Sequence, residues 1–340
     1  MRLLVLGGGG FLGYHAVVAA RDAGHDVTVL SRSGRAPVPG VQVLVGDRSG
    51  DLSALEGHRW DAAFDTFTDE ADGAPAVART AELLSGTVEG YGYVSGMSVY
   101  APTGPAVPDE AGPVRRAGRE TDRLQARSVA KLAGEAAVRA RFGDRALFPR
   151  VGIMVGPRSA RYTYWPVRFA RALRGERPRT VLVPGDLDRD VQYSDARDIA
   201  GWVVTMLAAG RGGTFNTVGP GRPETLRTVL DACLAAAGGA ADDVELVAGP
   251  EDLLRRRLTG VDEEERPLWF PEVQIPQLAI DSSAALAAGL TFRSARATAA
   301  ETLAWADEVG EAALTDAAFA ELEQPLLEVV RGRRDDATPA

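Results

Sequence analysis

Short apolar runs alternate with amphipathic stretches over the first two thirds of the chain. The run Arg2–Leu6 is followed by a glycine-rich turn, by helix-type apolar spacing from about Phe11, and by a second run, Asp26–Leu30. Short apolar runs bounded by turn residues are typical of buried strands, whereas apolar positions three or four apart are typical of helices. The same patterns predict strands at Val41–Val45, Ala62–Phe64, Tyr91–Ser95, Ala146–Val151 and Thr214–Val218, and helices at Pro75–Leu84 and Glu120–Arg141.

Strands that alternate with helices in this way predict an α/β fold with a doubly wound parallel sheet of the Rossmann type, covered on both faces. From Ala240 onward the chain is alanine-rich and predicts a smaller, mainly helical C-terminal lobe that binds the substrate. The last residues are polar and are expected to be disordered. The expected boundaries are 1–175 for the nucleotide-binding domain, with 190–220 returning to it, 176–189 and 221–330 for the lobe, and 331–340 for the tail.

The turn after the first strand has the glycine spacing of a dinucleotide cradle, at Gly7, Gly10 and Gly13. Gly7 permits the tight turn, Gly10 lets backbone N–H groups approach a pyrophosphate, and Gly13 lets the helix pack close to the sheet. The pyrophosphate is then expected on the free N–H groups where the helix starts, at Phe11 and Leu12. The turn therefore predicts a nicotinamide dinucleotide cofactor.

The end of the second predicted strand favours NADP(H). NAD-binding chains usually place an acidic residue there for the ribose hydroxyls. This chain has Ser31, Arg32 and Arg35 instead, whose hydroxyl and guanidinium groups suit a 2′-phosphate. The alternative is that both arginines are ordinary loop charges, so NAD(H) stays a second possible cofactor.

Polar residues follow the next predicted strands. Asp47 can accept a hydrogen bond from the adenine amino group, and Arg48 can stack on the ring or reach a phosphate; the alternative for Asp47 is a helix cap. Ligands of parallel sheets bind at the carboxyl ends of the strands. The residues Thr66, Phe67, Thr68, Ser95 and Gly96 all fall at such ends.

Composition narrows the class of protein. The 340 residues include 45% hydrophobic residues, but no apolar run is long enough to span a membrane, and the N-terminal segment lacks the basic start and small-residue cleavage site of a signal peptide, so a cytoplasmic protein is expected. Cys233 is the only cysteine and the three histidines, His15, His25 and His58, lack the spacing of a metal site. A net charge of −9 argues against a nucleic-acid partner. The expected partner is a small molecule, bound by a monomer or homodimer.

Lys131 stands out because it is the only lysine among the 38 basic residues. It lies in the predicted helix Glu120–Arg141. An exposed helix lysine is the alternative to a functional role. That alternative is weak in a chain that otherwise uses arginine for every cation.

Further sequence features accompany the glycine turn and Lys131. They are the strand end Ser95-Gly96-Met97-Ser98-Val99-Tyr100 and the segment Arg150-Val151-Gly152-Ile153-Met154-Val155-Gly156-Pro157. Together these features resemble the extended short-chain dehydrogenase/reductase superfamily, and more closely its atypical reductase and epimerase-like branch. The resemblance implies that the cofactor is also contacted by Thr66, Lys131, Pro149, Gly152 and Ile153.

In that superfamily a Ser or Thr polarises the carbonyl, a Tyr passes the proton, and a Lys four residues later holds the nicotinamide ribose. Lys131 matches the lysine, but the tyrosine position is Arg127 and the serine position, four before Tyr100, is Gly96. A guanidinium with a pKa above about 12 has no proton to exchange near neutral pH. The resemblance thus implies a site without its usual acids, in which Lys131 binds the ribose hydroxyls.

The expected function is an NAD(P)H-dependent ketoreductase that obtains its proton elsewhere. One source is a replacement side chain, for which Ser95, Ser98, Tyr100, Tyr162 and Tyr164 are candidates. The other source is the substrate, because a hydroxyl beside a ketone polarises the carbonyl and accepts its growing charge. Aromatic polyketides have this arrangement, so an aromatic ketone of antibiotic biosynthesis is the expected substrate.

A flat substrate of this kind needs an apolar, aromatic pocket. The substrate candidates are Ser95, Met97, Arg127, Tyr162, Tyr164 and Trp165, with Trp269 and Phe270 in the C-terminal lobe. For the tryptophans, core packing is an equal alternative. Arg127 can either face a substrate oxygen or pair with an acidic neighbour.

Other functions stay open. A nucleotide-sugar epimerase or dehydratase would need a base at position 127, which Arg127 cannot supply. A redox sensor that binds NADP without turnover would explain the lost acids but not the retained Lys131. An RNA-binding relative is disfavoured by the pI of about 5.1.

Overall fold

The computed structural model divides the chain into two compact units. The first unit comprises Met1–Ile153, Ala196–Gly221 and Ala279–Phe292, and the second comprises Met154–Asp195, Arg222–Leu278 and Arg293–Ala340. The structure describes all residues except 68–72, 103–106, 119–122, 222–223, 259–260, 262–265, 269–278, 311–316 and 337–340, and within α10 also leaves the side chains of 317–318 and 333–336 undescribed.

An eight-stranded parallel sheet forms the centre of the first unit, in the order β12-β7-β5-β4-β1-β2-β3, with β6 also paired to β7. This confirms the predicted Rossmann-type α/β fold. The strands are β1 (Arg2–Leu6), β2 (Asp26–Ser31), β3 (Gln42–Val45), β4 (Trp60–Asp65), β5 (Val88–Tyr93), β6 (Ser95–Gly96), β7 (Ala146–Val151) and β12 (Gly213–Thr217).

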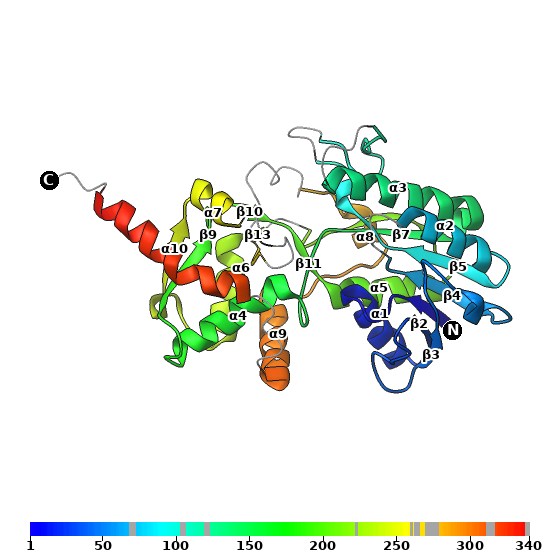
Figure 1. Ribbon diagram of the computed structural model, residues 1–340, viewed down its shortest axis with the longest axis horizontal. Helices are drawn as coiled ribbons and strands as arrows, with labels where there is room; N and C mark the ends of the chain where they lie inside the picture. The colour runs from blue at the N-terminus through cyan, green and yellow to red at the C-terminus, as the bar shows by residue number, and fades with distance from the viewer. Residues whose placement is uncertain are drawn as a thin grey trace. The chain divides into compact units, whose positions relative to one another are not determined.

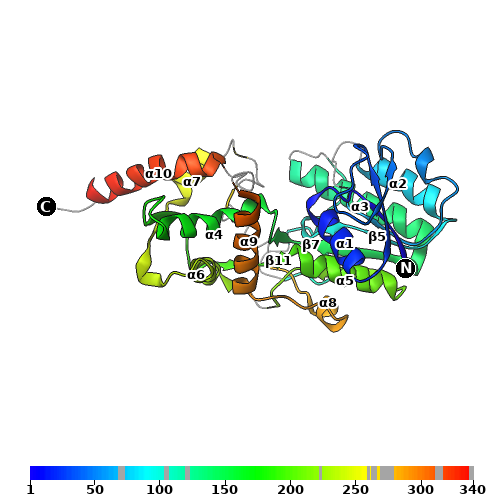
Figure 2. The same ribbon diagram turned by 90° about the horizontal axis from the view of Figure 1, so that it is seen from below.

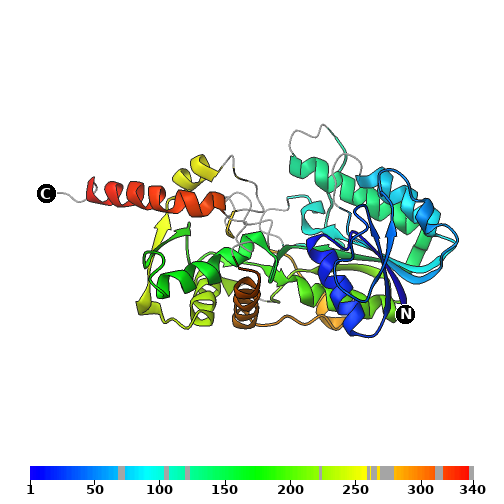
Figure 3. The same cartoon turned by 60° about the horizontal axis from the view of Figure 1, so that its bottom comes forward.

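Helices cover both faces of this sheet (Figures 1 and 3). Helices α1 and α5 pack together on one face, and α2 and α3 pack together on the other. The helices of this unit are α1 (Phe11–Asp22), α2 (Gly73–Leu84), α3 (Arg123–Phe142), α5 (Ala196–Ala208) and α8 (Ser283–Ala287), with short 3-10 turns η1 (Ser53–Leu55), η2 (Met97–Val99) and η3 (Gly143–Arg145).

Burial of β1 explains why the sheet forms around it. Residues Leu3 to Leu6 are fully buried, because β1 lies between β2 and β4 and has a helix layer on each face. The register aligns Leu6 with Leu30 of β2 and with Asp65 of β4. Asp65 is in turn aligned with Tyr93 of β5. The carboxyl ends of these strands therefore meet at one edge, beside the glycine turn that follows Leu6.

The predicted strand Tyr91–Ser95 is two strands in the structure. β5 ends at Tyr93 and β6 begins at Ser95, so Val94 lies between them. The Val94 N–H donates to the Asp65 carbonyl, whereas the Val94 carbonyl accepts from the Lys131 side chain of α3. The break in the strand thus frees a backbone acceptor at the edge of the sheet.

The second unit contains helices and three short two-stranded sheets. Helices α4, α6 and α9 pack against one another, and α9 runs across the other two (Figure 2). The elements are β8 (Ile153–Val155), α4 (Ala160–Leu173), β9 (Thr180–Pro184), β10 (Asp190–Val191), β11 (Tyr193–Asp195), β13 (Glu224–Thr225), α6 (Leu226–Ala236), η4 (Ala241–Asp243), β14 (Glu245–Gly249), α7 (Glu251–Leu258), α9 (Ala295–Val309) and α10 (Ala317–Asp336).

The boundaries differ from those expected from the sequence. The first unit ends at Ile153 and not at 175, because α4 packs against α6 and α9 of the second unit. Ala279–Phe292, expected in the lobe, belongs to the first unit. Hydrogen bonds within the first unit hold it there, including those from Asn216 Nδ2 to the Asp281 carbonyl (2.8 Å) and from Trp202 Nε1 to the Ala288 carbonyl (3.2 Å).

The expected disordered tail also needs correction. Helix α10 continues to Asp336, and only 337–340 lie outside the described residues. Arg331 anchors the helix to the parallel pair β9 and β14, because its guanidinium pairs with Glu245 (3.1 Å) and donates to Thr180 (2.9 Å). The strand β14 was itself missing from the helical pattern predicted for this lobe.

Within the described part of the chain, no helix combines the length and the apolar character needed to cross a lipid bilayer.

Candidate active site

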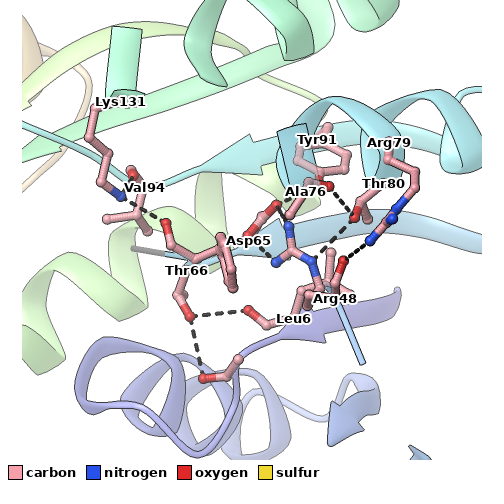
Figure 4. Close-up of polar contacts among 12 residues, drawn as sticks. Leu6, Arg48, Asp65, Thr66, Ala76, Arg79, Thr80, Tyr91, Val94 and Lys131 are labelled. Atoms are coloured by element: carbon pink, nitrogen blue, oxygen red, sulfur yellow. Dashed lines mark hydrogen bonds and ion pairs between the residues drawn. The ribbon is translucent and has the colours of Figure 1, made fainter. Parts of the chain in front are cut away.

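The glycine turn has the geometry of a close-packed cradle. Gly7 has a φ of +94°, which favours glycine, and a Cβ there would lie 2.4 Å from Thr66 Oγ1. At Gly13 a Cβ would lie only 2.2 Å from the Gly7 carbonyl oxygen. Thr66 fastens the turn to β4, since its hydroxyl donates to the carbonyls of Leu6 (3.1 Å) and Gly7 (3.3 Å) (Figure 4).

Helix α1 offers free N–H groups where a pyrophosphate is expected. Its N-cap is Gly10, which has no side chain to cap the helix, and its first turn carries no acidic residue. The N–H groups at Phe11, Leu12 and Gly13 therefore need acceptors, and the helix dipole favours an anion there. These residues fit the dinucleotide predicted from the sequence.

Replacing Gly13 by alanine is expected to weaken NAD(P)H binding by about 10–100-fold, because the new methyl group meets backbone atoms of the turn that cannot move aside. Gly86→Ala is the matched control, since Gly86 lies between α2 and β5, away from the glycine turn, and a Cβ there has no atom within 4 Å. Fluorescence titration of the two variants with NADPH compares them. Equal affinities would contradict the cradle geometry.

The residues after β2 lie at the surface. Ser31 Oγ lies 3.1 Å from Ser33 Oγ, which also accepts from the Arg35 N–H (3.3 Å). Arg32 and Arg35 are exposed, and neither guanidinium has a hydrogen bond or ion pair with another described residue. Both cations are thus available to a ligand.

Arg48 does not lie where the sequence predicted, beside the adenine ring or a phosphate of the cofactor. Its guanidinium neither faces solvent nor is free for an adenine or phosphate, because it is buried and pairs with Asp65. Asp47, the residue before it, is half-buried and accepts a hydrogen bond from the Ser49 N–H (2.9 Å). That bond is an Asx turn, so the carboxylate of Asp47 caps its own loop.

Lys131 projects from α3 to the carboxyl edge of the sheet, as Figure 4 shows. It is 5% exposed, and Nζ donates to the carbonyls of Val94 (2.7 Å) and Phe67 (2.9 Å). The ammonium also lies 4.9 Å from the centre of the Tyr93 ring, a cation–π distance. Lys131 is therefore no exposed helix lysine, and one of its three N–H donors stays available for a cofactor ribose.

The surroundings weaken the proton affinity of this amine. Burial, reinforced by the charge of Arg127, lowers the pKa of Lys131 to about 7. A neutral amine retains two N–H groups. Lys131 can consequently lose a proton while still donating to both carbonyls.

Lys131 should make stability depend on pH. The unfolded lysine holds its proton up to about pH 10, whereas the folded one loses it near pH 7, so stability rises with pH across this window. We expect the free energy of unfolding to gain about 2 kcal/mol from about pH 7 to about pH 9 through this group. Urea denaturation of the cofactor-free protein measures it, and Lys131→Met should remove that gain.

Arg127 and Gly96 occupy the tyrosine and serine positions of the resemblance. Arg127 is half-buried one helical turn before Lys131, and its guanidinium has no hydrogen bond or ion pair with the rest of the described chain. It therefore does not pair with an acidic neighbour there. Gly96 ends β6, and a Cβ there would have ordinary contacts, at 3.6 Å from the Val151 carbonyl oxygen. No packing constraint thus requires glycine at this position.

Ser95 lies beneath the helix that carries Lys131. It pairs in register with Arg150, so both side chains lie on the same face of the sheet, and that of Arg150 reaches Glu135 of α3. Ser95 is 1% exposed, and its hydroxyl has no hydrogen-bond partner in the described structure. A buried hydroxyl of this kind is costly unless a group not present here pairs with it.

Tyr100 belongs to a buried network that no sequence pattern indicated. Its hydroxyl donates to Asn216 Oδ1 (2.6 Å) and accepts from Arg150 (2.9 Å), whose guanidinium forms a two-point pair with Glu135. Burial raises the pKa of Tyr100. Tyr100 is thus held as a structural donor and is no free acid.

The other residues implied by the resemblance lie on β7 and the segment after it. Pro149 is buried within β7, two residues before the strand ends. A Cβ at Gly152 would approach Val218 (2.9 Å) and the sulfur of Met97 (3.3 Å), so this glycine permits close packing beside Met97. Ile153 is 5% exposed. Of this group, Gly152 and Met97 are partly accessible to a ligand.

The aromatic pocket expected in the lobe is a core. Tyr162 and Trp165 are fully buried and Tyr164 is 4% exposed. Their neighbours lie inside the second unit: Trp165 Nε1 donates to the Pro267 carbonyl (3.2 Å), and the Tyr164 ring packs edge-on against Phe319. These three residues therefore stabilise the second unit and offer no surface to a substrate. Trp269, Phe270 and Thr68 lie outside the described residues.

A cavity of about 490 Å³ adjoins the start of α3. Arg115, on its wall, donates to the Ser98 carbonyl (2.9 Å), two residues after Gly96. This is a candidate substrate surface within the first unit. Its lining residues are Ala101, Pro102, Pro113, Val114, Arg115, Arg116 and Gln125.

Comparison with known proteins identifies the family. A sequence model of the NAD-dependent epimerase/dehydratase family matches residues 3–219, well over half of the chain. The chain belongs to this family. Members of the NAD-dependent epimerase/dehydratase family are enzymes of the NAD-dependent oxidoreductase type, which confirms the epimerase-like branch expected from the sequence. No curated protein matches the chain.

Solved structures of similar fold include several nucleotide-sugar epimerases. UDP-N-acetylglucosamine 4-epimerase from Bacillus cereus is 18% identical, with a TM-score of 0.64 over 89% of this chain and 96% of that one. WbmH from Bordetella bronchiseptica, solved with NAD+, is 15% identical (TM-score 0.64, 91% and 99% covered). UDP-glucose 4-epimerase from Thermus thermophilus, also with NAD, is 22% identical (TM-score 0.61, 89% and 99% covered). At these identities the likeness establishes the fold alone.

Proposed function

We propose that this family member is an NADPH-dependent ketoreductase that works without a tyrosine acid. The observation that carries the proposal is the pairing on α3. Lys131 is kept and buried at the edge of the sheet, whereas Arg127, one turn earlier, cannot give up a proton. A site that can hold a nicotinamide ribose but has no tyrosine to act as a base suits reduction of a carbonyl better than oxidation of an alcohol.

The chain's own residues then have distinct tasks. The N–H groups at the start of α1 bind the pyrophosphate, and Lys131 binds the ribose hydroxyls with its remaining N–H. The bound cofactor supplies a hydride to the carbonyl carbon. Arg127 stabilises the negative charge that develops on the carbonyl oxygen, because it is half-buried and its guanidinium is free of described partners.

The proton comes from the substrate in this proposal. A phenolic hydroxyl beside the ketone gives its proton to the new alkoxide oxygen, and the phenolate left behind takes a proton from water. A positioned acid is worth about 10²–10⁴ in rate, so the substrate has to supply an effect of that size. Without a tyrosine acid, the enzyme is expected to reduce only ketones that carry such a hydroxyl.

An aromatic polyketide is the proposed substrate, in a pathway of antibiotic biosynthesis. This rests on a resemblance at Gly96, Arg127 and Lys131 to the angucyclinone ketoreductase of simocyclinone biosynthesis, an atypical reductase without the catalytic tyrosine. With the lobe aromatics buried, we place substrate contacts at Met97, at Arg127 and along the cavity wall near Ser98.

NADPH consumption against paired aromatic ketones tests the proposal. One set carries a free hydroxyl beside the carbonyl, and in the other set that hydroxyl is methylated. Turnover confined to the free-hydroxyl set supports substrate-assisted reduction. Equal turnover of both sets would show that the protein supplies an acid, and NADPH binding without any turnover would favour a redox sensor.

NADPH should be preferred to NADH because of the two free cations after β2. Arg32→Ala with Arg35→Ala is expected to weaken NADPH binding by about 10²–10⁴-fold and to leave NADH binding unchanged, because each of the two charge-assisted hydrogen bonds to the 2′-phosphate is worth about 1.5–3 kcal/mol. Calorimetric titration measures both affinities. Arg59→Ala is the control, an exposed arginine that precedes β4 and thus lies at the opposite edge of the sheet. A matched loss for NADH would contradict a 2′-phosphate site.

Nucleotide-sugar epimerisation is the second candidate, favoured by the family and by solved neighbours that are UDP-sugar epimerases. It requires a base to remove a hydroxyl proton at the first step. Arg127 cannot serve as that base. We therefore expect no change in UDP-glucose or UDP-N-acetylglucosamine incubated with the protein and NAD+, and an epimerised product detected by anion-exchange chromatography would reverse the order of the two candidates.

A further inference from the structure

A fully buried carboxylate lies at the carboxyl end of β4. Asp65 has no exposed surface, and its two oxygens form a two-point ion pair with Arg48, at 2.6 Å to Nη1 and 2.7 Å to Nη2. The Tyr91 hydroxyl donates to the same carboxylate at 2.6 Å, and Arg48 Nε donates to the Thr80 hydroxyl at 3.2 Å (Figure 4). Every charged group of this cluster is thus satisfied within the first unit.

The Asp65 carboxylate of this cluster reaches Lys131 through Phe67. The Phe67 N–H donates to Asp65 Oδ1 (3.0 Å), and the Phe67 carbonyl accepts from Lys131 Nζ (2.9 Å). Arg48 also holds this residue from its side-chain face, since its guanidinium lies 4.8 Å from the centre of the Phe67 ring. The position of one of the two Lys131 acceptors is therefore fixed by the Arg48–Asp65 pair.

Folding alone does not account for such a pair. A buried ion pair gains little net stability, because removing two charges from water costs about as much as their attraction returns. An apolar pair would fill the same space. This cost points to a task beyond the packing of β4.

We propose that the Arg48–Asp65 pair is a positioning element for Lys131, which fixes the Phe67 carbonyl under the ammonium and balances the charge around it. Arg48 directly follows Asp47 at the end of β3, so the pair connects the adenosine side of the expected cofactor site with the residue that holds the ribose. The part of this inference that concerns the cofactor rests on the proposed function. The link from Arg48 to Lys131 rests on the contacts alone.

Charged groups of both signs lie around Lys131. Arg127 and Glu135 lie one turn before and after it on α3, and Asp65 and Arg48 approach from the ends of β4 and β3. The Tyr93 ring of β5 faces the ammonium as well. Asp65 raises the pKa of Lys131, whereas Arg48 and Arg127 lower it. Asp65 and Arg48 consequently shift the pKa of Lys131 in opposite directions.

This opposition gives a sharp test, because Lys131 is the only lysine in the chain. Protein grown with lysine labelled with carbon-13 at Cε gives one lysine side-chain resonance, whose pH titration reports Lys131 directly. Arg48→Gln should raise its midpoint by about one pH unit, and Asp65→Asn should lower it by about one unit. Thr80→Val is the control, because it removes a hydrogen bond of Arg48 and leaves both charges in place; its midpoint should stay unchanged.

A pair that served only the packing of β4, with no electrostatic effect at the Lys131 ammonium, would not produce shifts of opposite sign. Two folded variants whose midpoints move in the same direction, or not at all, overturn the proposal. Thermal unfolding of each variant confirms that the titrated protein is folded. The titrations use cofactor-free protein, so their result does not depend on the ketoreductase proposal. A protein that fails to turn over ketones can still show the expected shifts, and the two failures are therefore distinguishable.

A second measurement uses the unaltered protein, in case removal of a buried charge prevents folding. Phe67 precedes Thr68 in the only Phe-Thr step of the sequence. Phenylalanine labelled at its carbonyl carbon and threonine labelled with nitrogen-15 therefore select the Phe67 carbonyl as one signal. That signal should shift with pH at the same midpoint as the Lys131 resonance, and a Phe67 carbonyl that does not respond would overturn the proposal.

Discussion

Replacing Lys131 by methionine is expected to lower kcat/KM for ketone reduction by about 10²–10³. Methionine fills similar space but removes the charged donor, and a hydrogen bond from a charged group to the ribose hydroxyls is worth about 1.5–3 kcal/mol. The carbonyls of Phe67 and Val94 also lose their shared donor, so the edge of the sheet that shapes the site is no longer tied to α3. Steady-state kinetics with varied NADPH measure the loss, most of which should appear in the cofactor KM.

Arg141→Met is the matched control for this loss. Arg141 lies on the same helix, but it is exposed and forms a surface ion pair with Glu82 (2.8 Å). A surface ion pair of this kind contributes little to the stability of the protein. Its kinetics should equal those of the unaltered enzyme. A Lys131→Met variant that keeps normal NADPH affinity would show that the ribose is held by other groups and would remove the main support for the proposed function.

The features that could be predicted from the sequence depend on local spacing. The turn Gly7–Gly13 follows from steric rules over a few residues, and the structure places it between β1 and α1. The stack of Arg127 and Lys131 follows from helical periodicity, since residues four apart share a face. Neither inference needs knowledge of which strands are neighbours.

The partners of Lys131 could not be predicted in the same way. The acceptors at Phe67 and Val94 are backbone carbonyls, and any residue type can supply a carbonyl. The Arg48–Asp65 pair joins two strand ends that become neighbours only through the order of the sheet. One signal was present, because Asp65 is a carboxylate directly after the apolar stretch Ala62–Phe64, and a charge at the end of a buried strand needs a partner.

The aromatic residues of α4 show where the pattern misleads. Tyr162, Tyr164 and Trp165 are large and apolar, and such residues suit a flat ligand as well as a core. The sequence pattern of α4 does not tell a helix that borders a cavity from one enclosed on all sides. In the structure α6 and α9 pack against α4 and these three side chains are buried, which favours the core interpretation of them.

Restoring the missing acid should give a large gain of function. In Gly96→Ser with Arg127→Tyr, the new serine has room, since the atoms nearest to a Cβ at Gly96 lie 3.6 and 3.7 Å away. The new tyrosine would stand one turn before Lys131, whose positive charge lowers the pKa of a neighbouring phenol. We expect turnover of the methylated ketones to rise by about 10²–10⁴, the worth of a positioned general acid.

The gain should be selective, and this selectivity separates a restored acid from a general improvement of the enzyme. Ketones with a free hydroxyl already carry their proton source, so the double variant should reduce them at most a few times faster. Gly96→Ser alone supplies a hydrogen bond but no acid and should leave the methylated set close to its original rate. If the folded double variant binds NADPH and still fails on the methylated ketones, the lost tyrosine is not what restricts the substrate, and the restriction has to lie in the shape of the pocket.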